Sequence, residues 1–594
     1  MEGVSWHFCI VYLFSVYSNG EPMTCDVRAR TDSGWVCGLR RVADDGVVFA
    51  SFLGVPYARQ PVGQLRFAEL KPAEPWNDYL DATQEGPVCP QYDKVYGNLV
   101  RPDREMSEAC IRANIHVPEA ALPSSDASSS PVEDPFGHAA GLQRDDPKEE
   151  HKGLPILVFI HGGGFQSGSG DTDLHGPEYL VGKGMLVATF NYRINVFGFL
   201  SINTPDIPGN AGLRDMITFL RWMKKNARSF GGDPENVTLM GQSAGAACAH
   251  ILSLSESAKG LFKRLILLSG TGIPSFFSAS PIYAKTIATM FLKQLGINST
   301  NPEEIHKELI TVPLERIIKA NQQVQFDIGL TSFVPVVEGI HPGVTRVLDD
   351  EPIDLIKRGR GKEYPIIMGF TNAEGEFFRR RIQYQDLIGR IQNNSALLLN
   401  SRLVFSTPPN VSRDLGKKVG SKYFNGPPNL EDFIKIVTYN FFEYPAFKLA
   451  QWRSETDSAA TYMYEFSYTS DLNIIRDALM LVDYEGATHV EDLTYVFKER
   501  QYLGDFGTLP PRDNLIKAWM TSFIYNFMMC SNPTCIEDEV SPWPKVQKGS
   551  LNYQVVAEPA YNSEPTPKQW DMISFFDSIE EKARNTAFST PTAA

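Results

Sequence analysis

Short apolar runs and helical patterns follow one another through the middle of the chain. Each apolar run has the length of one buried strand. In chain order these runs are Ile111–Val117, Ile156–Ile160, Met185–Phe190, Val237–Met240, Leu265–Leu268 and Pro365–Met368. Helices are predicted at Met216–Met223, where apolar residues recur at helical spacing before two lysines, and at Ala244–Leu254. Continuous apolar strands between helices predict an α/β fold with a large, mostly parallel sheet covered on both faces.

One stretch interrupts this alternation. Residues 123–152 are rich in Ser, Pro, Asp and Gly, so they bury little apolar surface and are predicted to form a disordered loop insertion. The alternation resumes after it, so we expect a single large domain over residues 21–582 and not several domains, although the chain has 594 residues. Residues 583–594 are expected to be a disordered tail.

Composition narrows the possible partners. The formal net charge is −14, which argues against nucleic acid because phosphate binding needs clustered Lys and Arg. No run of 18 apolar residues occurs, and the C-terminus carries no hydrophobic tail, so no membrane anchor is predicted. The sequence predicts neither a metal site nor a cofactor, since neither a CxxC nor an HExxH pattern occurs.

The start of the chain predicts secretion. Residues Phe8–Val16 are mostly apolar, and Ser18 and Gly20 place small residues before a cleavage point, so we interpret residues 1–20 as a signal peptide. The competing interpretation is a buried N-terminal strand. With no anchor predicted, we expect a soluble extracellular protein.

Cysteines and glycosylation sequons agree with an oxidising compartment. Plausible disulfides are Cys89 with Cys110 and Cys530 with Cys535, while Cys25 and Cys37 are left either paired or free. Cys248 is expected to be a buried free thiol. Sequons that predict surface glycosylation stand at Asn298, Asn393 and Asn410; a fourth, at Asn236, enters an apolar strand.

The strongest chemical signal is the pentapeptide Gly241–Gly245, with Ser243 at its centre. It follows a predicted strand and opens a predicted helix, as a nucleophilic serine on a sharp turn requires. A second signal, His161 to Phe165, contains three glycines directly after another strand. Backbone N–H groups of such a loop, together with that of Ala244, can stabilise an oxyanion. A phosphate loop is disfavoured because no Lys-Ser or Lys-Thr follows the glycines.

A serine nucleophile also needs a base and an acid, in the chain order serine, acid, histidine. Glu374 follows the strand Pro365–Met368, and His489 lies further on. Taken singly, each is more simply explained as a surface carboxylate or a structural histidine.

Several separate motifs give the chain a specific resemblance. It resembles the type-B carboxylesterase and cholinesterase family of the α/β-hydrolase fold, from about Val47 to Ser578. The motifs are Phe52–Ala58, Pro61–Gly63, Leu65–Phe67, His161–Phe165, Asn191–Arg193, Phe230–Pro234, Gly241–Gly245 and the segments around Glu374 and His489.

The resemblance implies a role for each matching residue. Ser243 is expected to be the nucleophile, Glu374 the acid and His489 the base. Gly163, Gly164 and Ala244 are expected to be the oxyanion donors. The resemblance also implies the Cys89–Cys110 disulfide.

Within the family, the chain looks most like the juvenile hormone esterases of moths and butterflies. The segments Gly241–Ala246, Gly486–Asp492 and Trp519–Phe523 carry that likeness. Two departures are Met216, where those enzymes usually have Gln after the Asp, and the long stretch 123–152. The function implied is a secreted serine esterase that hydrolyses the methyl ester of juvenile hormone through an acyl-enzyme.

Three alternatives compete with that function. One is a general secreted or antennal carboxylesterase acting on odorant, dietary or xenobiotic esters. A cholinesterase is disfavoured because residues 90–109 contain no Trp to face a choline cation. A non-catalytic adhesion protein is disfavoured because the triad is complete.

The predicted partner is a small apolar ester. Phe276, Phe277 and Phe333 are candidate lining residues for its acyl chain, although ordinary core packing explains them equally well. The sequence leaves the oligomeric state open, with a monomer as the expectation.

Overall fold

The fold is taken from a computed structural model. It describes residues 25–93, 95–96, 103–123, 153–273, 277–329, 331–470, 474–479, 484–503, 509–535 and 542–586. The predicted signal peptide and residues 124–152 of the predicted insertion lie outside the described residues. The last described helix runs to Thr586, and the remaining residues of the predicted tail also lie outside.

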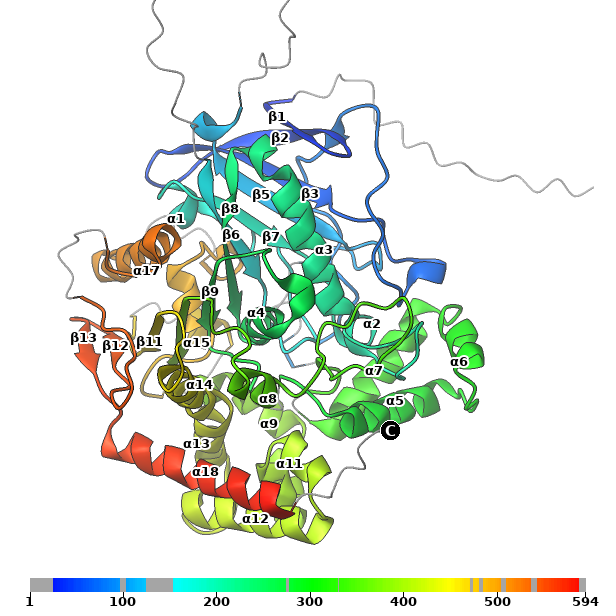
Figure 1. The fold of residues 1–594 in the computed structure, drawn as a ribbon, viewed down its shortest axis with the longest axis vertical. Helices are drawn as coiled ribbons and strands as arrows, with labels where there is room; N and C mark the ends of the chain where they lie inside the picture. The colour runs from blue at the N-terminus through cyan, green and yellow to red at the C-terminus, as the bar shows by residue number, and fades with distance from the viewer. Residues whose placement is uncertain are drawn as a thin grey trace, which may run out of the picture.

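A single sheet of thirteen strands runs through the described residues (Figure 1). The strands are β1 Val27–Thr31, β2 Gly34–Val42, β3 Val48–Pro56, β4 Leu80–Asp81, β5 Arg112–Pro118, β6 Leu154–Ile160, β7 Leu186–Phe190, β8 Gly232–Gln242, β9 Arg264–Leu268, β10 Ile366–Thr371, β11 Thr461–Phe466, β12 Tyr553–Val556 and β13 Tyr561–Ser563. Their order is β1-β2-β3-β5-β7-β6-β8-β9-β10-β11-β12-β13, with β4 paired to β2. Along this order pairing is parallel from β7 to β12 and antiparallel from β1 to β7 and between β12 and β13; β4 lies parallel to β2.

Burial along the strands follows this topology. In β1 buried and exposed residues alternate, as in an edge strand with one face toward water, whereas all residues of β7 and β10 are buried. Alternate residues of β6 enter different cores. Ile156, Val158 and Ile160 pack into one apolar cluster, and Leu157 and Phe159 pack into another. The sheet therefore separates two hydrophobic cores.

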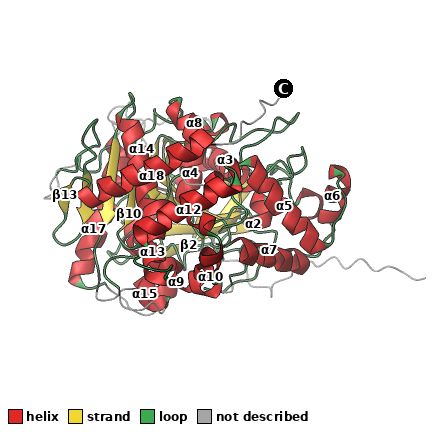
Figure 2. Cartoon of the chain, turned by 90° about the horizontal axis from the view of Figure 1, so that it is seen from below, coloured by secondary structure: helices red, strands yellow, loops and turns green. Residues whose placement is uncertain are grey.

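Helices cover both faces of the sheet, and Figure 2 shows the strands passing between them. Residues of α3 and α4 belong to the first core, and residues of α17 belong to the second. The helices are α1 Glu178–Val181, α2 Asn195–Phe199, α3 Ala211–Asn226, α4 Ala244–Leu254, α5 Pro281–Leu295, α6 Pro302–Leu309, α7 Leu314–Ile328, α8 Pro352–Lys357, α9 Arg379–Tyr384, α10 Leu387–Asn393, α11 Ser401–Ser406, α12 Pro409–Tyr423, α13 Leu430–Thr438, α14 Tyr444–Ser454, α15 Ile474–Ala478, α16 Arg500–Leu503, α17 Pro511–Cys530 and α18 Pro567–Thr586.

The predicted α/β fold with a large, mostly parallel sheet is confirmed. Helix α4 has the predicted bounds, and each of the six predicted strands is present. Strand β8 begins at Gly232, five residues before the predicted start. Its first half is polar and carries no apolar signal, but backbone pairing of Gly232 with Leu154 extends the strand.

Three parallel strands bring the predicted catalytic segments to one edge of the sheet. Strand β6 ends at Ile160 before the glycine segment, β8 ends at Gln242 before Ser243, and β10 ends at Thr371 before Glu374. In the register Ile160 pairs with Gly241. Parallel strands direct their carboxyl ends to the same side, which is where α/β sheets bind ligands.

Candidate active site

Ser243 occupies a sharp turn between β8 and α4. Its backbone angles, φ 54° and ψ −122°, are outside the regions that non-glycine residues favour. The turn requires a close approach, because a Cβ atom on Gly245 would lie 2.1 Å from the carbonyl oxygen of Ile160. The Ser243 N–H donates to the carbonyl oxygen of Leu268 on β9 at 2.8 Å. The serine is thereby held at the carboxyl end of a central strand.

The glycine segment lies directly beside this turn. Gly163 and Gly164 have positive φ values of 100° and 60°, and a Cβ atom on Gly163 would lie 2.1 Å from the carbonyl oxygen of Ser167. Ala244 is the first residue of α4, so its N–H belongs to the amide groups that a helix leaves without an internal acceptor. Burial lowers the pKa of His161 to about 4, so this neighbour is neutral at ordinary pH.

Glu374 and His489 meet through two loops that are bonded to each other. The backbone N–H of Ala373 donates to the carbonyl oxygen of Ala487 at 2.9 Å. Glu374 is fully buried; its Oε1 accepts from the Thr371 N–H at 2.9 Å, and its Oε2 is hydrogen-bonded to His489 Nδ1. An ionised carboxylate only accepts, so the proton of this bond belongs to Nδ1 and leaves Nε2 of the neutral imidazole as an acceptor.

Aromatic rings surround the imidazole of His489. The ring centroids of Phe442, Phe377 and Phe378 lie 4.9, 5.4 and 5.7 Å from it. Gln242 completes the enclosure, with its Nε2 3.2 Å from His489 Nε2. The sequence alone assigned no role to the three phenylalanines, although Phe377 and Phe378 follow Glu374 almost directly.

Four of the six residues predicted for catalysis line one cavity of about 60 Å³; Glu374 lies behind His489, and Ala244 follows Ser243 in the chain. Ser243 and His489 line it together with Gly163 and Gly164. A hydroxyl nucleophile, an imidazole acceptor held by a carboxylate, and backbone donors therefore share one small space. This arrangement suits nucleophilic acyl transfer.

Charged side chains also line this cavity. Arg381 of α9 forms an ion pair with Asp93, and its guanidinium lies 5.3 Å from the ring centroid of Tyr96. The Tyr96 hydroxyl in turn donates to the carbonyl oxygen of Phe377. Asp93 and Tyr96 belong to the chain segment closed by the Cys89–Cys110 disulfide, so that bond fixes part of the cavity wall.

Of the predicted pocket phenylalanines, Phe277 and Phe333 do not line this cavity. Phe277 is buried against Phe165 and Phe442, one ring away from His489. Phe333 packs edge-on to Phe291, with ring centroids 5.8 Å apart. Phe276 lies outside the described residues. A role for these residues in holding an acyl chain stays a prediction.

The cysteines pair largely as predicted. Disulfides join Cys89 to Cys110 and Cys530 to Cys535, and Cys25 to Cys37, the pairing that the sequence left open. Cys248 is a buried free thiol, as expected.

The predicted glycosylation sites are all exposed. Asn298, Asn393 and Asn410 lie on the surface, whereas Asn236 is half-buried and its Oδ1 accepts from Arg264 at 2.6 Å. Their modification stays a prediction.

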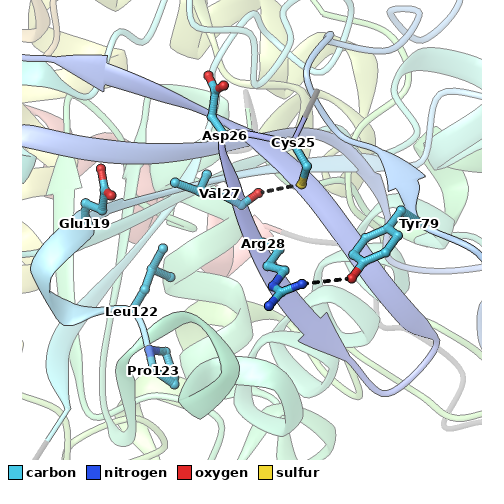
Figure 3. Close-up of a pocket in the computed structure, with 8 residues that line it drawn as sticks. All are labelled: Cys25, Asp26, Val27, Arg28, Tyr79, Glu119, Leu122 and Pro123. Atoms are coloured by element: carbon cyan, nitrogen blue, oxygen red, sulfur yellow. Dashed lines mark hydrogen bonds between the residues drawn. The ribbon is translucent and has the colours of Figure 1, made fainter. Parts of the chain in front are cut away.

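A larger cavity of about 480 Å³ lies elsewhere, at the N-terminal strands (Figure 3). Arg28 and Tyr79 point toward one another there, and the guanidinium donates to the phenol oxygen at 3.2 Å. Among the described residues, its lining has neither a serine nor a histidine.

Metal sites and membrane spans are both absent from the part of the chain that the structure describes. No group of three or more His, Cys, Asp or Glu side chains there is placed to hold a metal ion. Among the same described residues, no helix is long and apolar enough to cross a membrane.

Comparison with known proteins places this geometry in a family. A family profile described as the carboxylesterase family matches residues 26–572. The chain is 48% identical to a juvenile hormone esterase of Heliothis virescens, over 95% of this chain and 96% of that protein. It is 28% identical to an acetylcholinesterase of Bungarus fasciatus, over 94% of this chain and 89% of that protein.

A solved structure shows the same likeness. The juvenile hormone esterase of Manduca sexta, solved with OTFP covalently attached, superposes with a TM-score of 0.85 at 49% identity, covering 93% of this chain and 99% of that one. By its sequence motifs, its sheet topology and these similarities, the chain belongs to the carboxylesterase family.

Proposed function

We propose that this chain is a serine carboxylic ester hydrolase in which Ser243 attacks the ester carbonyl. His489 Nε2 accepts the hydroxyl proton as the bond from Ser243 Oγ to the carbonyl carbon forms. Glu374 holds the imidazole through Nδ1 and stabilises its cation. The single observation that carries this proposal is the common cavity of Ser243, His489, Gly163 and Gly164.

The backbone donors stabilise the charge that develops on the carbonyl oxygen. In the proposed mechanism the N–H groups of Gly163, Gly164 and Ala244 bind that oxyanion; one such donor lowers the barrier by about 3–4 kcal/mol. The tetrahedral intermediate collapses, His489 gives its proton to the leaving alkoxide, and the alcohol departs. Water then attacks the acyl-enzyme carbonyl while His489 accepts its proton. The bond to Ser243 Oγ breaks, His489 returns the proton to that oxygen, and the acid is released.

For the substrate, we propose the methyl ester of juvenile hormone. The support is the high identity, over nearly the whole length of both chains, to esterases named for that hormone. Methanol is then the small alcohol released, and the acyl part is a long apolar chain. Burying such a chain contributes about 0.8 kcal/mol per methylene, so an apolar site achieves affinity without charge.

Secretion belongs to the same proposal. Three disulfides among the described residues support an oxidising compartment, and residues 1–20 have the pattern of a signal peptide. Expression in insect cells with and without residues 1–20 tests this. The full chain is expected in the medium and the shortened chain inside the cells; equal retention of both would refute secretion.

The deciding experiment compares kcat/KM for juvenile hormone and for 1-naphthyl acetate, with Ser243→Ala as the blank. A hormone value well above the naphthyl value, with a KM in the low-micromolar range or below, supports the proposed substrate. Fast naphthyl hydrolysis with negligible hormone turnover would make this a general carboxylesterase. Equal inactivity of the wild type and Ser243→Ala would refute hydrolysis itself.

A further inference from the structure

A second cavity adjoins the catalytic one. Its volume is about 80 Å³, and four residues line both spaces: Gly163, Gln242, Phe377 and Val490. The proposed mechanism places no reacting atom in this second cavity. It is therefore a space next to the reacting atoms with no function yet assigned.

The walls of the second cavity are mostly apolar. The aliphatic side chains of Leu174, Ile475, Leu479 and Leu493 line it; the last three come from α15, the residue after it and the turn Glu491–Tyr495. The polar side chains in its lining are those of His161, His175, Gln242, Glu499 and Tyr502. Apolar walls that continue from the catalytic cavity suit the carbon chain of an ester more than a charged group.

One buried carboxyl group stands in this apolar wall. Glu499 is only 2% exposed and lines the cavity, and its Oε2 has no hydrogen-bond partner among the described residues. Burial, together with the nearby carboxyl groups of Glu491 and Asp492, raises the pKa of Glu499 well above its usual value. A carboxyl group in this state is uncharged and carries an O–H donor.

The uncharged Glu499 carboxyl group in this mostly apolar cavity favours a specific kind of ligand. A carboxylate would be excluded, because its charge would be buried without a cation. A hydrocarbon alone would leave Glu499 Oε2 without a hydrogen-bond partner. An uncharged acceptor oxygen on an otherwise apolar chain, such as an ether, an epoxide or a ketone, satisfies both the walls and the donor.

We propose that the second cavity is a subsite for the part of the substrate that carries such an acceptor oxygen, and that Glu499 donates a hydrogen bond to it. This deepens the proposed ester hydrolysis and rests on it, since the ester carbonyl lies at Ser243 while the second oxygen lies beyond Gln242. Glu499 then determines specificity and takes no part in the bond-making steps.

The test uses a matched pair of substrates: an unsaturated long-chain methyl ester, and the same ester with one double bond converted to an epoxide. The ratio of their kcat/KM values is measured for the wild type, Glu499→Leu and Glu499→Gln. A neutral hydrogen bond predicts a wild-type preference of about 3- to 10-fold for the epoxide. Glu499→Leu should reduce the ratio to about one, whereas Glu499→Gln, which keeps an uncharged donor, should retain most of it.

Two measurements keep the test decisive. Hydrolysis of 1-naphthyl acetate reports whether each variant is folded and active; failure of the wild type on every ester would refute the proposed function and not the subsite alone. If Glu499→Leu does not fold, Ala478→Leu replaces it, because this half-buried side chain lines the cavity and its enlargement fills it. It should also reduce the ratio.

Two outcomes would contradict the proposed subsite. A wild-type ratio near one, or a ratio that Glu499→Leu or Ala478→Leu leaves unchanged while small esters are hydrolysed normally, would overturn the subsite. In that case Glu499 makes no contact with the substrate.

Discussion

Replacing Glu374 by glutamine changes the charge of the proposed acid and keeps its shape. The hydrogen bonds of the carboxylate determine how the amide sits. Because the Thr371 N–H donates to Oε1, the amide oxygen of the introduced glutamine takes that place. The amide NH₂ then faces His489 Nδ1, where the carboxylate Oε2 stood. The imidazole must accept at Nδ1, so its proton moves to Nε2, the nitrogen that should take the proton of Ser243.

The magnitude follows from the cost of restoring the productive tautomer. Turning the amide over would aim its NH₂ at the Thr371 N–H and leave a buried donor unpaired, which costs about 1–3 kcal/mol. The imidazolium formed during catalysis also loses the stabilising charge beside it. Together these effects correspond to a loss of about 10³- to 10⁴-fold in kcat, as is typical when the acid of a serine triad becomes an amide.

Steady-state hydrolysis of 1-naphthyl acetate measures this loss, with thermal unfolding as the control for folding. Glu374→Gln should unfold near the wild-type temperature, because every hydrogen bond of the buried group is retained in the resting state. Glu374→Asp keeps the charge on a shorter side chain and should lose less activity. A Glu374→Gln variant that is normally folded and within tenfold of the wild-type kcat would refute the assigned role of the acid.

Three further predictions concern stability. Cys89→Ser opens the Cys89–Cys110 loop, whose ends are 21 positions apart, and should lower the free energy of unfolding in urea by about 3 kcal/mol. An unchanged unfolding free energy would contradict this. Asp215→Asn removes the negative charge that pairs with the buried Arg193, and should lower the free energy of unfolding in urea by about 3–5 kcal/mol. An equally large loss in a variant with an exposed Asp→Asn substitution would contradict this. Burial raises the pKa of Glu491 to about 8, so the folded state retains a proton that the unfolded state releases above pH 4.5. The free energy of unfolding should therefore fall from pH 5 to pH 8. In Glu491→Gln this fall should be smaller, by an amount on the order of 1 kcal/mol or more.

The sequence predicted best those features that local physical chemistry determines. Helix α4 and the turn at Ser243 follow from glycines at fixed places between an apolar strand and an apolar helix. The parallel sheet follows from continuous apolar runs. The pairing of Glu374 with His489 needed the resemblance to a family, because neither residue has a local pattern that separates it from a surface side chain.

Contacts between distant segments could not be predicted in the same way. Phe442 packs on His489 from the region between α13 and α14, and nothing in its own segment indicates that contact. Phe333 is an aromatic residue of the kind that lines apolar pockets, but it packs on Phe291. An apolar residue in a sequence fits a core and a cavity wall equally well. Glu499 is conspicuous only when its burial is known, because a charged residue in a sequence is most simply assigned to the surface.

The backbone bond between Ala373 and Ala487 has a consequence for how relatives of this chain diverge. This hydrogen bond joins the loop of Glu374 to the loop of His489, two residues that are 115 positions apart. The distance between acid and base is therefore set at the edge of the sheet. The intervening chain leaves the sheet after β10 and returns at β11. Helices α10 to α12 can therefore be replaced by those of a relative without changing the relative positions of Glu374 and His489. Chimeras across this segment should inherit their catalytic rate from the sheet and their stability from the donated helices.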